Sequence, residues 1–268
     1  MFPAPLRSGM LILLPPSEGK TPPKAGEPLD LTELSFAGLA KTRKAVLAAL
    51  IRFSRTDPTA AAVALGLGPT QAGHVRTNTQ LKRAPAAPAL DIYTGVLFEA
   101  LDAGSLRHAE RARLNRLVAI SSALFGLVRP DDRIPAYRLS GDTTLPDLGP
   151  MSSVWRGQVS AQLELESGLI LDLRSGTYVA LGPVPSAVAD RSVVGRILHE
   201  HAGKRSIVSH HNKATKGRLV RSLVEASSLP GSIPDLLDAL SSLGYGVELQ
   251  PTRKTGVQAV VDIIVSEI

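Results

Sequence analysis

The sequence predicts a mixed α/β (α+β) fold in which a central mixed sheet is flanked by helices. Short apolar runs at residues 10–14, 117–120 and 168–173 have the length of buried strands. Longer segments, such as residues 36–54, repeat apolar side chains at helical spacing with few breakers. Strands and helices do not alternate strictly, so the pattern favours a mixed sheet with a helical insertion near residues 36–115.

The length and composition predict one large folded unit. The chain has 268 residues, of which 44% are hydrophobic, enough to bury a full core and too many for a disordered chain. We expect an N-terminal extension at residues 1–9 and a single domain at residues 10–268. The chain has no cysteine, which excludes a disulfide framework, a thiolate zinc site and a cysteine nucleophile.

The first half of the chain predicts one strand followed by helices. The strand at residues 10–14 ends at the prolines 15–16, which cannot continue a central ladder. Asp57 is a good helix N-cap with Pro58 at the first helical position, which predicts a short Ala-rich helix. Further helices are expected from Pro69 into the 70s, over residues 89–102, and over residues 105–115 after Gly104, with Ser105 as the N-cap.

The second half of the chain predicts most of the strands. The expected elements are a strand at residues 117–120, a turn-rich loop at 125–135, a helix at 152–166, a strand at 168–173, strands at 193–198 and 206–209, helices at 214–226 and 233–243, and a closing pair of strands at 245–249 and 257–265.

The charge balance indicates an affinity for anions. Lysine and arginine number 30 and aspartate and glutamate 24, which gives a net charge of +6. Such a surface favours polyanions, such as nucleic acid, nucleotides or phosphorylated substrates. The alternative is an ordinary surface that happens to be rich in arginine.

The hydropathy pattern predicts no membrane partner. The longest apolar-dominated run, residues 117–128, contains two serines and a glycine and is shorter than the ~18 residues that span a bilayer. The apolar run at residues 10–14 is also shorter than the ~7–15 residues of a signal-peptide core. We therefore expect an untargeted, cytoplasmic protein.

Residues 65–72 have the form of a helix-hairpin-helix turn. The pattern is hydrophobic-Gly-hydrophobic-Gly-x-x-x-Ala, with the glycines at Gly66 and Gly68. Two glycines allow a tight turn between helices, and the amides that follow can hold a DNA phosphate. The alternative is an ordinary helix–turn–helix connection.

Several cations stand where a phosphate could bind. Lys20 follows the first strand, but Leu14 takes the place of the first P-loop glycine and the next two prolines remove amides, so Lys20 is expected as a single phosphate or carboxylate contact. Arg129 and Arg138 lie in a polar loop after a strand. Lys213, Lys216 and Arg218 cluster at an expected helix start, where anions are favoured.

The histidines suggest, but do not establish, a metal site. His199 and His201 would share one face of a strand, and His210 and His211 follow nearby. Solvated side chains at strand ends account for the same pattern. We predict no metal site and no cofactor.

Motifs along the chain resemble those of the YaaA family of peroxide stress resistance proteins. The matching pieces are residues 10–16 with Lys20-Thr21, residues 91–95 (D-x-Y-T-G), residues 121–130 with 137–139, Trp155, residues 172–178, Lys213-Ala214 with Gly217-Arg218, and Gly244-Tyr245. The chain departs from the family pattern in three places: residues 15–20 carry an insertion, residues 174–176 read Arg-Ser-Gly, and Phe125 replaces a tyrosine. The resemblance implies a mixed α/β fold with a helix-hairpin-helix-like element, a positively charged cleft and DNA binding without strong sequence preference, in a cytoplasmic protein of cells facing peroxide.

Three functions remain open at this stage. The first is DNA binding, with phosphate contacts from Lys20, Gly66, Gly68, Arg129, Arg138, Lys213, Lys216 and Arg218. The second is an enzyme acting on a nucleotide or nucleobase, because hydroxyl groups accompany the cations in the motifs. Its candidate catalytic residues are Lys20, Tyr93, Ser121 and Tyr137. The third is a structural or interaction protein. The oligomeric state stays open.

Overall fold

The computed structural model describes residues 9–201, 203–250, 252 and 255–266, so residues 1–8 of the predicted extension lie outside the described part. Within that part, eight strands form one sheet in the order β11-β12-β9-β8-β1-β3-β4, with β10 beside β9. The strands are β1 (Met10–Leu14), β3 (Val118–Ser122), β4 (Gly126–Val128), β8 (Leu169–Asp172), β9 (Ser192–His201), β10 (Lys204–Ser206), β11 (Gly246–Gln250) and β12 (Ala259–Val265). The predicted mixed α/β fold is confirmed.

The central strands of the sheet are parallel and buried. β12, β9, β8, β1 and β3 run parallel, whereas β4, β10 and β11 pair antiparallel with their neighbours. Every residue of β1, β3 and β8 is buried, as expected of strands covered on both faces. Leu13 pairs with both Ala119 and Asp172, which fixes the register across the centre.

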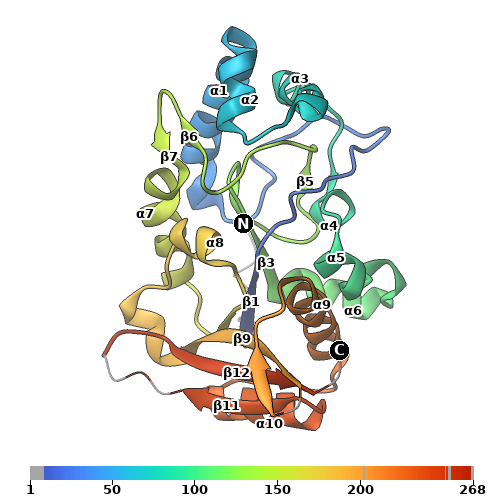
Figure 1. The fold of residues 1–268 in the computed structure, drawn as a ribbon, viewed down its shortest axis with the longest axis vertical. Helices are drawn as coiled ribbons and strands as arrows, with labels where there is room; N and C mark the ends of the chain where they lie inside the picture. Colours follow the sequence, from blue (N-terminus) through green and yellow to red (C-terminus); the bar gives the residue numbers. More distant parts are fainter. Residues whose placement is uncertain (1–8, 202, 251, 253–254, 267–268) are drawn as a thin grey trace, which may run out of the picture.

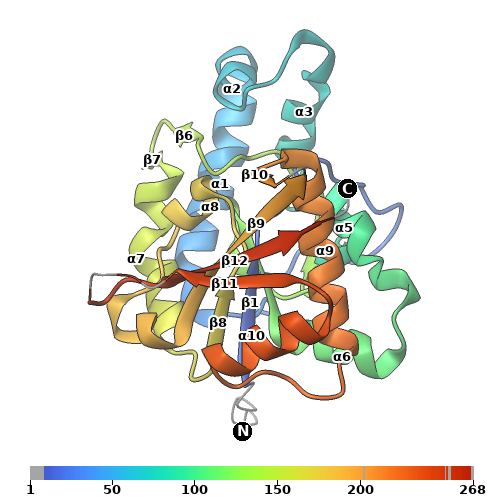
Figure 2. The same ribbon diagram turned by 60° about the horizontal axis from the view of Figure 1, so that its bottom comes forward.

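Helices cover both faces of the sheet. They are α1 (Ala40–Thr56), α2 (Pro58–Ala64), α3 (Gly73–Thr79), α4 (Ala89–Ile92), α5 (Val96–Leu101), α6 (His108–Leu117), α7 (Met151–Glu164), α8 (Gly176–Ala180), α9 (Ser209–Glu225) and α10 (Ile233–Ser242). In Figures 1 and 2, α1, α7 and α8 lie on one side of the central strands, and α5, α6 and α9 lie on the other. In the described part of the chain, no helix combines the length and apolar character needed to cross a bilayer.

Short elements complete the chain. These are 3-10 turns η1 (Ala37–Leu39), η2 (Pro69–Gln71), η3 (Ala103–Ser105) and η4 (Ser186–Arg191), and the two-residue pairs β2 (Ala87–Pro88) with β5 (Arg133–Ile134) and β6 (Thr144–Leu145) with β7 (Gly149–Pro150).

The helical insertion lies between β1 and β3, as predicted. Asp57 caps α2 by accepting a hydrogen bond from the Ala60 amide at 2.9 Å. Gly66 turns the chain with a φ of 63°, which glycine adopts at little cost. The α2–α3 turn projects beyond the sheet at the top of both views (Figures 1 and 2).

Several predicted element boundaries are wrong. The strand expected at residues 206–209 is β10 (Lys204–Ser206), and Ser209 already belongs to α9. The helix expected at residues 89–102 is split, because the Tyr93 backbone leaves the helix to pair with Lys20 and Gly95 has a φ of 93°. Ser105 caps no helix; α6 begins later, at His108, where Glu110 accepts the Arg107 amide. Residues 125–135 contain β4 and β5 rather than a plain loop.

The start of α9 is also earlier than predicted. No glycine or proline interrupts residues 209–216, so the helix begins at Ser209, after β10. Lys213, Lys216 and Arg218 therefore lie beyond the first turn of α9 rather than at its start. Gly217 allows α9 to pack closely against α5, because a Cβ at this position would clash with the Leu97 carbonyl oxygen.

Candidate functional site

The strand order places a candidate site at the carboxyl ends of β1, β3 and β8. The chain passes from β1 to β3 on one side and later to β8 on the other, so the order of strands reverses at β1. In open parallel sheets, ligands bind outside the carboxyl ends of the strands at such a reversal. In Figure 2, β1 runs upwards, towards the end of the molecule from which α2 and α3 project.

Lys20 lies at this position, in the loop after β1. Its Nζ is 4.4 Å from the ring centroid of Tyr137 and 5.4 Å from that of Tyr93. It donates a hydrogen bond to the Ser17 carbonyl oxygen at 2.9 Å. Burial lowers the pKa of the Lys20 amine to about 8. The Lys20 amine therefore loses its proton more readily than an ordinary lysine.

Three hydroxyl groups form a chain beside Lys20. The Tyr137 hydroxyl lies 2.9 Å from that of Tyr93 and 2.7 Å from the Ser122 Oγ. Burial raises the pKa of Tyr93 to about 12 and that of Tyr137 well above its ordinary value. Both phenols therefore stay protonated and can donate hydrogen bonds. We call Lys20, Tyr93, Tyr137 and Ser122 the lysine–tyrosine cluster.

The cluster includes three of the four predicted catalytic candidates. Ser121 is not among the residues that the structure brings together. Successive residues of a strand point to opposite faces, so Ser122 reaches Tyr137 and Ser121 points away. The buried Ser121 Oγ has no hydrogen-bond partner in the described part of the chain. Because side chains alternate along β3, Ser121 and Ser122 lie on opposite faces of the sheet. Ser122 could have been predicted only if the face on which Tyr137 lies had been known.

Arg138 connects the cluster to the α2–α3 turn. Its Nη1 lies 2.9 Å from Glu18 Oε2. Asn78 of α3 holds the Arg138 backbone by two hydrogen bonds, at 2.8 and 2.9 Å. A pocket of about 330 Å³ lies between these parts, lined by Glu18, Arg138, Ser140, Asp142, Thr143 and residues 63–66. The turn that carries Gly66 and Gly68 therefore borders the same end of the sheet.

Helix α9 reaches this end from the other side. Lys216 donates a hydrogen bond to the Leu173 carbonyl oxygen, just beyond β8, at 2.7 Å. Burial lowers the pKa of Lys216. Next to it, Asp172 and Arg174 form a buried ion pair at 2.6 Å. Lys213 and Arg218 of the same helix are exposed.

Arg129 is far from the predicted phosphate site. It follows β4, which returns antiparallel from the carboxyl end of β3 to its amino end. There its Nη1 donates to the carbonyl oxygens of Arg116 and Val118 at 3.0 and 3.1 Å. Its Nη2 lies 3.5 Å from Glu166 Oε1, and the guanidinium covers the Phe36 ring. The structure thus places Arg129 at the opposite end of β3 from the cluster.

The histidines pack together on β9 and α9. The rings of His199 and His211 meet edge to face at 5.6 Å. Burial lowers the pKa of His199. Among the described residues, no group of three or more histidine, aspartate or glutamate side chains is arranged to hold a metal ion.

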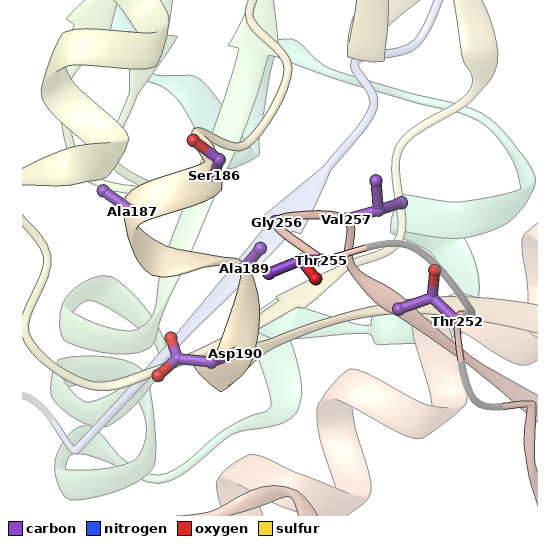
Figure 3. Close-up of a pocket in the computed structure, with 8 residues that line it drawn as sticks. All are labelled: Ser186, Ala187, Ala189, Asp190, Thr252, Thr255, Gly256 and Val257. Atoms are coloured by element: carbon purple, nitrogen blue, oxygen red, sulfur yellow. The ribbon is translucent and has the colours of Figure 1, made fainter.

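A larger pocket, of about 630 Å³, lies away from these residues, between η4 and Thr252, Thr255, Gly256 and Val257 (Figure 3). Small and hydroxyl-bearing side chains line most of it, and Asp190 is the ionisable one among the eight lining residues that Figure 3 labels. The described residues of this lining include no lysine or arginine, whereas the lysine–tyrosine cluster combines an amine with three hydroxyl groups at the carboxyl end of β1.

Lys20 should leave a pH signature on stability. Its pKa in the folded state is about 8, below its ordinary value of 10.5, so between these values the unfolded chain binds more protons. The free energy of unfolding then rises with pH in this window. We expect the wild type to gain stability over Lys20→Met from pH about 8 to about 10.5, in urea unfolding curves. A stability difference that does not change with pH would show that folding does not shift the pKa of Lys20.

Comparison with known proteins shows the family of this chain. The family model described as peroxide stress protein YaaA matches residues 10–250. A UPF0246 protein of Streptomyces coelicolor is 44% identical over 97% of this chain and 100% of its own length. A UPF0246 protein of Corynebacterium efficiens is 43% identical over 94% of this chain, again over its whole length. The chain therefore belongs to the peroxide stress protein YaaA family.

Proposed function

We propose that this protein binds DNA without strong sequence preference, across the carboxyl end of the sheet, as part of an oxidative stress response. Membership of the peroxide stress protein YaaA family supports the stress-related role. The proposal of DNA binding depends on the charge distribution of this chain.

The observation that carries the proposal is a pair of segments without acidic residues. Residues 58–90 and residues 201–224 contain no aspartate or glutamate. Their exposed basic side chains include His74, Arg76, Lys82, Arg83, Lys204, Lys213 and Arg218. Proteins that bind a phosphate backbone gather cations on one face in this way.

The two segments border the same end of the sheet. The first supplies residues 63–66 to the pocket beside Glu18 and Arg138. The second supplies Lys216, which touches the chain just after β8. A duplex lying across the carboxyl ends of β1 and β8 would meet the exposed cations of both segments.

The exposed cations, rather than the buried ones, are the proposed phosphate contacts. Arg138 is paired with Glu18, Lys216 with a carbonyl oxygen, and Lys20 lies between tyrosine rings. Gly66 and Gly68 are exposed at the α2–α3 turn, but the Gly66 amide donates to the Val63 carbonyl oxygen at 3.0 Å and the Gly68 amide to Gln71 Oε1 at 3.4 Å, so these two amides are not among the proposed contacts.

Fluorescence anisotropy with labelled duplex and single-stranded DNA tests the proposal. We expect submicromolar binding to unrelated duplex sequences at low salt, which weakens steeply as salt rises because bound phosphates release counterions. Equal affinity for unrelated sequences would support backbone recognition. Binding that is absent even at low salt would overturn the proposal.

A second candidate is an enzyme acting on a nucleotide or nucleobase. The observation that favours it is the lysine–tyrosine cluster, in which a lysine with a lowered pKa meets neutral hydroxyl groups. A purely electrostatic binder does not need this arrangement. Thermal stabilisation by free nucleotides, lost in Tyr137→Phe, would support it, whereas no stabilisation by any nucleotide would count against it.

A further inference from the structure

His199 of β9 is a buried histidine that lies between the sheet and α9. The residue is 2% exposed, and neither ring nitrogen has a hydrogen-bond partner among the residues that the structure describes. α9 packs against β9, and the ring of His211 meets that of His199 at a centroid distance of 5.6 Å. A protonated imidazole carries an N–H on each nitrogen, so a proton on His199 would bury a charge with two unused donors.

The strands beside His199 bring basic groups to its side of the sheet. Val265 of β12 and Ser206 of β10 pair with His199, and neither carries a charge. His201 lies two residues along β9, on the same side of the strand, and Lys204 of β10 pairs with it. The titratable groups that these strands place near the ring are therefore basic, and they oppose a positive charge on it.

Helix α9 faces the same ring with two more basic groups and one amide. His211 and Arg218 are seven positions apart, which places them on one face of the helix. Both disfavour a proton on His199, whereas Asn212 favours one. Burial is the largest influence and also disfavours the charged ring, so the pKa of His199 is lowered.

The carboxylates nearest to His199 in sequence are directed elsewhere. Glu200 lies on the opposite side of β9, and its Oε2 accepts a hydrogen bond from Arg205 Nε at 2.7 Å. Residues 201–224, which include β10 and most of α9, contain no aspartate or glutamate. The packed arrangement of β9 and α9 therefore suits the neutral form of His199 and not the charged form.

We propose that the contact between His199 and α9 is acid-sensitive, and that a proton on His199 loosens the first two turns of α9, residues 209–215, from β9. When these turns move away, the ring reaches water, where both N–H groups find acceptors. A falling pH then favours the loosened form, because that form binds the additional proton. The proposal concerns the packing of α9 on the sheet and does not depend on DNA binding.

Backbone hydrogen exchange tests the proposal, as protection factors measured at about pH 7.5 and about pH 5.5. The ordinary pKa of histidine is 6.5, so at the lower pH a water-exposed His199 is mostly charged and favours the loosened form by up to about tenfold. We expect protection in residues 209–215 to fall by about this factor, while β1 and α7 keep theirs. His199→Leu should abolish the fall, whereas His108→Gln, at an exposed histidine that begins α6, should leave it unchanged.

An NMR titration of the wild-type imidazole groups keeps the proposal testable even if His199→Leu fails to fold. A pKa of His199 below 6.5, together with the loss of protection in residues 209–215, would support the proposal. A pKa of 6.5 or above would overturn it, and so would equal protection factors at the two pH values. A fall in protection that persists in His199→Leu, or that His211→Gln alone abolishes, would assign the effect to another group and also overturn the proposal.

Discussion

Replacing Arg76, Lys82, Lys213 and Arg218 together by glutamate should weaken duplex DNA binding by about 100-fold at low salt. All four side chains are exposed, two on each acid-free segment. None of them takes part in an ion pair within the described part of the chain, so the native structure does not depend on their charge. Each substitution removes a phosphate contact and adds repulsion, and the affinity is measured by anisotropy.

A matched control changes the same amount of charge elsewhere. Lys41 and Lys44 on α1, Arg116 at the end of α6 and Arg156 on α7 are also exposed and lie outside the two segments. Their joint replacement by glutamate should weaken binding much less than the first variant. Equal losses in both variants would show that binding follows net charge alone, and would contradict a site at the carboxyl end of the sheet.

Replacing Arg174 by methionine should lower the free energy of unfolding by about 3–5 kcal/mol, because it leaves a buried carboxylate without its partner. The Arg174 side chain is fully buried and that of Asp172 is 1% exposed. Arg174 also donates to the Gly182 carbonyl oxygen at 2.9 Å, which ties the end of β8 to the chain after α8. Urea unfolding measures the loss.

Two further variants test the reason for this loss. Arg52→Met removes the partner of Asp147 in a pair whose side chains are more than half exposed, so we expect a change below about 1 kcal/mol. Combining Arg174→Met with Asp172→Leu removes both buried charges and should recover much of the stability. A double variant as unstable as Arg174→Met would show that the lost hydrogen bonds, rather than the unpaired charge, cause the effect.

Local sequence signals predicted the elements that depend on neighbouring residues. The run at residues 10–14 is apolar on both faces, and this pattern belongs to a central parallel strand. Asp57 and Pro58 mark the start of α2 by capping chemistry alone. Lys20, Tyr93 and Tyr137 were selected from motifs, and the structure brings the three together.

Features that depend on contacts between residues far apart in the chain could not be predicted from the sequence. The antiparallel return of β4 carries Arg129 to the other end of β3. Gly126, with a φ of 74°, marks the turn, but the sequence does not show that β4 pairs back along β3. The break at Tyr93 depends on its pairing with Lys20, which is 73 positions away in the chain. Lys213 and Lys216 cannot be distinguished from the sequence. They lie on different faces of α9, so that Lys216 reaches the end of β8 and Lys213 is exposed to solvent.

The salt dependence of duplex binding, measured for the wild type and for the variant with Arg76, Lys82, Lys213 and Arg218 replaced by glutamate, tests the central claim most directly. Each phosphate contact contributes about −0.9 to the slope of log affinity against log salt. If these side chains hold the DNA, the wild type should show a steep slope and the variant a slope shallower by several units. Parallel slopes for the two proteins would place the DNA elsewhere and contradict the proposed site.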